Sequence, residues 1–132
     1  MDPKTVVKEL WSSYNRGDLD ETWRTYVAEE LIVHPPPGIE LDRESWLATE
    51  KGFFAAFEDV DAKVLEQVAE GDMVASRWSL TGRQKAEFMG VPSGGRTATL
   101  TGMLFDRVRD DKIVEHWAEL GLPQFLQLLG AE

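Results

Sequence analysis

The sequence predicts an α+β fold in which helices from the first part of the chain cover one face of an antiparallel sheet. In the first third, apolar residues recur with the spacing of amphipathic helices. After Glu58 the chain changes to segments rich in β-branched and aromatic residues, separated by short turn sequences. Helices followed by a run of hairpins are typical of this fold class.

The length and composition fit one domain and exclude several classes of function. The chain has 132 residues, no cysteine and a formal net charge of -10. A chain of this length can bury a core without disulfides, so we expect a single domain over residues 1–132. The negative charge argues against binding to nucleic acids or to anionic membranes. The sequence has neither a signal-peptide pattern nor a membrane-spanning apolar run, and its lack of cysteine suits a reducing cytoplasm, so we expect a cytoplasmic protein.

Two helices are expected at the start of the chain. The first has an apolar face made of Val7, Leu10, Trp11 and Tyr14. Gly17 ends it, and Asp18 can cap the second helix, with Glu21 as the acidic member of a capping box. The apolar stripe of this second helix consists of Leu19, Trp23, Tyr26 and Val27.

Turn and cap residues place the remaining elements. "ELIVH" (30–34) is a short buried strand that "PPPG" ends, because proline cannot continue a ladder of hydrogen bonds. Asp42 caps a third helix, which carries Trp46, Leu47, Phe53, Phe54 and Phe57. We expect Ala62 to Leu120 to form one curved antiparallel sheet with the helices in its concave face. Pro123 then begins a short terminal helix that Gly130 closes.

Several segments resemble, in order and spacing, those of the SnoaL-like polyketide cyclases, which have the wider NTF2-like fold. These segments are "YNRGDLDETW", "VHPPPG", "FFAAFEDV", "EGDMVASRWSLTG", "FMGVPSGGR", "GMLFDRVRDDKIVEHW" and "LLG". The resemblance implies a cone-shaped α+β barrel, in which a curved sheet wraps around helices and leaves a deep apolar pocket. It also implies ring closure by intramolecular aldol chemistry without metal or cofactor, and dimerisation through the sheet.

The chain departs from the family pattern at the acid/base positions. The family's catalytic aspartate follows the "EHW"-type tryptophan and is Ala118 here, while its partner on the neighbouring strand is Leu104. A histidine after "LTG" is replaced by Arg83-Gln84, and an aspartate beyond "EHW" is replaced by Gly121. The resemblance therefore implies the pocket without the usual catalytic groups.

The last hairpin predicts which polar groups face that pocket. If "RDD" is a three-residue turn, Val108 pairs with Lys112, Leu104 faces His116, and Asp106 is a diagonal neighbour of His116. Side chains alternate along each strand, so even-numbered residues share one face and odd-numbered residues share the other. The even face holds Leu104, Asp106, Val114, His116, Ala118 and Leu120, and the odd face holds Met103, Phe105, Arg107, Ile113, Glu115, Trp117 and Glu119. By resemblance, the even face lines the pocket.

Asp106 and His116 are the leading catalytic candidates. A carboxylate beside a histidine can fix its tautomer and raise its pKa, which would make the pair a general acid/base. The alternative is a core histidine with one structural hydrogen bond and a solvated Asp106 near the end of the sheet, and the two interpretations are about equally weighted. His34, at the expected pocket mouth, is a weaker catalytic candidate, because a lone histidine is more often structural.

Other residues are candidates for binding a substrate. Arg77 could hold a carbonyl or carboxylate, or else form an ion pair with a neighbouring carboxylate. Trp23, Tyr26 and Trp78 could stack on a flat molecule or only fill the core, and Leu104 and Ala118 would line the pocket. "PSGGR" lacks the strand–loop–helix setting of a phosphate loop, and no close-spaced pair of metal ligands is found in the sequence, so we expect no metal. That the protein also needs no cofactor is what the resemblance implies.

Two classes of function remain open. One is a cyclase-like or isomerase-like enzyme that acts by acid/base chemistry on an apolar or aromatic carbonyl compound. The other is a pocket that binds such a molecule without turning it over, or a dimerisation module, which the residues at positions 104 and 118 favour. In either case Met103, Phe105 and Trp117 give the odd face an apolar surface, so we expect a homodimer through the sheet.

Overall fold

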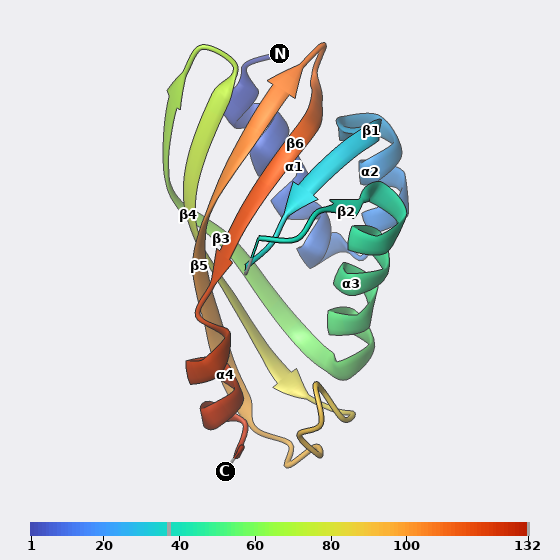
Figure 1. The fold of residues 1–132 in the computed structure, drawn as a ribbon. Coiled ribbons are helices and arrows are strands. Elements are labelled where there is room, and N and C mark those ends of the chain that lie inside the picture. Colours follow the sequence, from blue (N-terminus) through green and yellow to red (C-terminus); the bar gives the residue numbers. More distant parts are fainter. Residues whose placement is uncertain (37, 132) are drawn as a thin grey trace.

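The computed structural model describes residues 1–36 and 38–131, and it contains four helices and six strands (Figure 1). In chain order the elements are α1 (Pro3–Arg16), α2 (Leu19–Tyr26), β1 (Val27–His34), β2 (Leu41–Asp42), α3 (Arg43–Ala56), β3 (Phe57–Glu70), β4 (Met73–Gln84), β5 (Thr97–Arg109), β6 (Lys112–Leu120) and α4 (Leu122–Leu128). None of the helices in the described part of the chain has the length and hydropathy needed to cross a membrane.

The strands form one sheet in the order β2-β1-β6-β5-β4-β3, which curves without closing and has the helices on one side (Figure 1). The predicted α+β fold, with a curved sheet and helices in its concave face, is confirmed. The expected sheet was wrong in two details, because it begins at Phe57 and also includes β1, which runs parallel to β6. The β3–β6 hairpins leave one side of β6 unpaired, and β1 satisfies those backbone groups.

Local signals fixed most of the helix ends. Asp42 caps α3 by accepting a hydrogen bond of 2.8 Å from the Ser45 amide, and Gly17 ends α1 with a left-handed φ of 76°. The capping box predicted for α2 was wrong. Asp18 makes no capping bond with its side chain and instead accepts a hydrogen bond from Arg16 Nε at 3.1 Å. Val27 was placed on α2 by its spacing, but it is the first residue of β1.

The turn of the β5–β6 hairpin differs from the predicted one. Arg109 pairs with Lys112, and the two residues between them, Asp110 and Asp111, both have positive φ, 51° and 61°. This is a two-residue turn of the kind whose twist matches that of the flanking strands, so the three-residue turn was wrong. Sequence alone did not distinguish them, since aspartate at either position tolerates left-handed φ.

A bulge beyond the turn resets the register of the hairpin. The pairing shifts between Ile113 and Glu115, so that Asp106 lies directly opposite His116 and Leu104 opposite Ala118. The predicted register, in which Asp106 is only a diagonal neighbour of His116, was therefore wrong. The prediction that these four residues share the inner face of the sheet was right. The bulge also turns Ile113 inward, where it is 2% exposed, against its predicted place on the odd face.

Candidate active site

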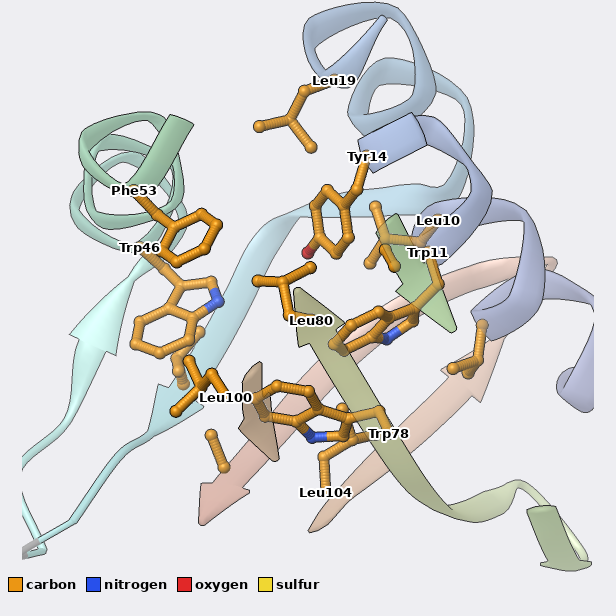
Figure 2. Packing of buried hydrophobic residues seen from close by; sticks show 14 of the residues in the cluster. Leu10, Trp11, Tyr14, Leu19, Trp46, Phe53, Trp78, Leu80, Leu100 and Leu104 are labelled. Carbon is orange, nitrogen blue, oxygen red and sulfur yellow. The ribbon is translucent and has the colours of Figure 1, made fainter. Parts of the chain in front are cut away.

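The helices and the concave face of the sheet enclose a cavity of about 850 Å³. Its walls come from α1, α3 and the strands, and Figure 2 shows aromatic and aliphatic side chains converging from all three. Most of the lining is apolar, including Leu10, Trp11, Trp23, Val27, Leu31, Trp46, Phe53, Trp78, Leu80, Leu100, Leu104, Ile113, Ala118 and Leu120. A pocket of this size and character suits a small organic molecule.

The exposed part of the lining marks the mouth of the cavity. It lies where α3, the loop after β4, and the start of α4 come together, and its exposed residues are Pro36, Thr49, Gly52, Glu87, Met89, Glu119 and Pro123. Among the described lining residues there is no arginine or lysine, and the only basic side chain is His116. The cavity therefore offers no fixed positive charge to an anionic ligand.

His116 and Asp106 form a hydrogen-bonded pair in the cavity wall. His116 Nδ1 lies 2.6 Å from Asp106 Oδ1, and the side chains are only 13% and 2% exposed. The pair occupies one row across the inner face of the sheet, between Val74 on β4 and Val33 on β1, which are both fully buried. Since Asp106 binds Nδ1, the tautomer is fixed and Nε2 is left for a molecule in the cavity.

Neighbouring carboxylates make His116 more basic. Burial by itself lowers the pKa of His116, but the charge of Asp106, its hydrogen bond, and the charge of Glu50 together outweigh burial, so the pKa is raised above 6.5. The imidazole is therefore a stronger base than a free histidine side chain, as suits a group that exchanges protons with a ligand.

The sequence analysis missed Glu50, a second titratable group in the same cavity. It lies on α3 between Trp46 and Phe53, and the nearby phenol of Tyr14 on α1 also faces the cavity (Figure 2). Burial raises the pKa of Glu50, while His116, Tyr14 and Trp46 act in the opposite direction. Burial and the charge of Glu50 raise the pKa of Tyr14 well above 10.0, so the phenol stays protonated and acts as a donor. A signal was present, because positions 46, 50 and 53 share one helical face and a carboxylate interrupts that apolar stripe.

The structure brings six of the sequence-predicted site residues to the cavity wall. These are His116, Asp106, Trp23, Trp78, Leu104 and Ala118. The indole N–H groups of Trp23 and Trp78 are buried and have no hydrogen-bond partner among the described residues.

The other predicted site residues lie outside the cavity. Arg77 is exposed on the outer face of β4, where its Nε binds Glu66 at 2.9 Å, so the ion-pair alternative describes it and the substrate-binding prediction does not. His34 also points to the outer face, where Nε2 lies 2.8 Å from Glu115 Oε2 and the ring stacks on Trp117. Both predictions failed for the same reason. Side chains alternate between the two faces of a strand, and the sequence of one strand does not show which face lines the cavity. Tyr26 is half-buried against the core and is not part of the lining.

No three histidine, aspartate or glutamate side chains of the described residues come together as metal ligands do.

Comparison with known proteins agrees with this fold. The model of the SnoaL-like polyketide cyclase family matches residues 4–127, and the chain belongs to this family. A search of curated proteins gives no match.

Solved structures of similar proteins share this fold. The structure of IdmH from Streptomyces antibioticus, described as a candidate polyketide cyclase, has a TM-score of 0.88 and 37% sequence identity, over 99% of this chain and 100% of that one. AclR from Streptomyces galilaeus, described as a candidate hydroxylase, has a TM-score of 0.87 and 26% identity, over 98% and 97% of the two chains. TsrD from Streptomyces laurentii has a TM-score of 0.83 and 25% identity, over 98% and 95%.

Proposed function

We propose that this protein is an acid/base catalyst of the polyketide cyclase type, which closes a ring by aldol addition or isomerises an apolar carbonyl compound. The observation that carries the proposal is the His116–Asp106 pair, held at 2.6 Å in the wall of a mainly apolar cavity. A positioned imidazole of this kind can move a proton to or from a carbon or oxygen atom of a bound ketone.

The lining supports an oxygen-bearing but uncharged substrate. Nε2 of His116, which Asp106 leaves unbound, can donate to a carbonyl oxygen, and no described lining residue is an arginine or lysine that would hold an anion. The aromatic walls suit a flat ring system, because ring faces stack on one another.

The test is hydrogen exchange on a small apolar ketone that fits the cavity. In deuterated buffer, the protein should accelerate exchange of the C1 hydrogens of 2-tetralone, and the rate should saturate with ketone concentration. Nuclear magnetic resonance follows the exchange, and calorimetry follows binding. No acceleration over buffer would contradict the catalytic proposal.

A specific observation keeps the binding-only alternative in view. The family's acid/base positions hold Leu104 and Ala118, which pair with each other on the inner face of the sheet. Neither side chain can accept or donate a proton. A protein that binds 2-tetralone tightly without exchanging its hydrogens would be a ligand-binding module.

We also propose that two copies associate through the outer face of the sheet. Val68, Ala75, Phe105, Trp117 and His34 lie in register across β3, β4, β5, β6 and β1, and we call this row the outer stripe. Its Val68 and Phe105 are 71% and 51% exposed, and adjacent Met103 and Ile32 are 62% and 43% exposed. Exposed large apolar side chains gathered on one sheet face often mark an interface. Phe105→Asp should therefore turn a dimer into a monomer in light scattering, and a wild-type monomer at micromolar concentration would contradict the proposal.

A further inference from the structure

Glu50 occupies a position that packing alone would give to an apolar residue. It lies on the inward face of α3, four residues after Trp46 and three before Phe53, and it lines the cavity with both of them. Trp46 also lies beside His116, with ring centroids 5.7 Å apart, so the side of α3 that carries Glu50 packs close to His116 on β6. A partly buried carboxylate in such a stripe costs stability, which a catalytic role can explain.

The groups that face Glu50 come from every wall of the cavity. Tyr14 approaches from α1, Asp106 from β5 and His116 from β6, while Glu87 and Glu119 lie at the mouth. Burial raises the pKa of Glu50 above 4.5, which makes its carboxylate a stronger base, and the charges of Asp106 and Glu50 raise the pKa of His116 above 6.5. Each charge also favours the charged form of the other group.

From this geometry we propose that Glu50 is the catalytic base, which removes a proton from the carbon beside the substrate carbonyl, while protonated His116 donates its Nε2–H to the carbonyl oxygen. The assignment rests on the proposed acid/base function of the cavity, and it changes the role of His116 from base to acid.

The proton balance closes without any further reactant. The C–H bond breaks, its electron pair forms the enolate, and the proton goes to a Glu50 oxygen while His116 stabilises the negative oxygen. In a ring closure, the enolate carbon attacks a second carbonyl, whose oxygen takes the proton from Glu50. In an isomerisation, Glu50 returns the proton to a different carbon. Both routes leave Glu50 ionised and His116 protonated.

Glu50→Gln tests the base, because it keeps the shape of the side chain and removes its ability to accept a proton. Exchange of the 2-tetralone C1 hydrogens should fall by about a hundredfold, as for other general bases, while calorimetry should give unchanged binding. Glu44→Gln, on the exposed side of the same helix, is the matched control and should keep wild-type exchange. The wild-type rate should rise as Glu50 ionises and fall as His116 loses its proton, which gives a bell-shaped pH profile.

The outcomes separate this inference from the proposed function. If the wild-type protein does not accelerate exchange, the proposed function fails and the role of Glu50 fails with it. If Glu50→Gln keeps full exchange while His116→Ala loses it, the acid/base function stands and the assignment of Glu50 as the base is overturned. If Glu50→Gln does not fold, Glu50→Asp replaces it: this variant keeps the carboxylate but withdraws it from the cavity, so it should bind 2-tetralone with reduced exchange, and full exchange would overturn the assignment.

Discussion

His116 and His34 lie on opposite faces of the same sheet, and each lies next to a carboxylate and a tryptophan ring. His116 binds Asp106 at 2.6 Å beside Trp46, and His34 binds Glu115 at 2.8 Å and stacks on Trp117. Their surroundings differ, because the His116 side chain is 13% exposed in a cavity wall and the His34 side chain is 25% exposed on the outer face. A histidine–carboxylate contact is therefore not a site by itself. The enclosed space beside it, where a ligand can replace water, makes the difference.

The carboxylates also differ in their other partners. Glu115 on the outer face also accepts a hydrogen bond from Arg107, whose Nη1 donates to Asp72 at 3.0 Å, so Glu115 belongs to a network of charges. Asp106 has His116 as its only side-chain hydrogen-bond partner among the described residues. The outer network is half-exposed, where ion pairs contribute little to stability. The inner pair instead concentrates its effect on one imidazole.

The largest difference between the two histidines is expected when each is replaced by alanine. His116→Ala should lower exchange of 2-tetralone by about a hundredfold, the usual loss for a general acid/base group. His34→Ala should leave the exchange rate unchanged, because His34 does not line the cavity. Equal losses in the two variants would show that the inner pair has no special role.

The next largest effect is expected when a methyl group is added to the inner face of the sheet at Gly102. A Cβ at Gly102 would lie 2.5 Å from Trp78 Cζ2 and would also collide with the Glu119 carbonyl oxygen. Gly102→Ala should therefore lower the free energy of unfolding by about 1–3 kcal/mol, the range for overpacked sites. Thr101→Ala on the exposed outer face should change it by less than about 0.5 kcal/mol. Urea unfolding measures both, and a neutral Gly102→Ala would mean that Trp78 can move aside.

The smallest effect should be on the pH dependence of stability. His116 has a raised pKa in the folded protein, so the folded state holds this proton more tightly than the unfolded chain does. Its contribution is complete below the unfolded pKa of about 6.5 and is lost as pH rises through the folded pKa. Urea unfolding at a series of pH values should show this decline in the wild-type protein and a smaller one in His116→Gln. An unchanged decline in the variant would contradict the raised pKa.

The sequence by itself determined the fold class, most of the element boundaries and the face to which the pair belongs. These depend on local signals: the apolar stripe of α1, the Asp42 cap, the left-handed Gly17 and the period of two along β5 and β6. Even with the wrong turn and register, the parity of positions 104, 106, 116 and 118 was preserved, because the bulge and the shorter turn together moved the pairing by two residues.

Tertiary structure alone decided which polar groups meet. The inward turn of Ile113 depends on a bulge, and the outward position of Arg77 and His34 depends on how β4 and β1 pair with their neighbours. Glu50 and His116 are 66 positions apart in the chain, as their numbers show, and no local pattern relates them. They come to line the same cavity only when α3 packs against the concave sheet, where the charge of each shifts the pKa of the other.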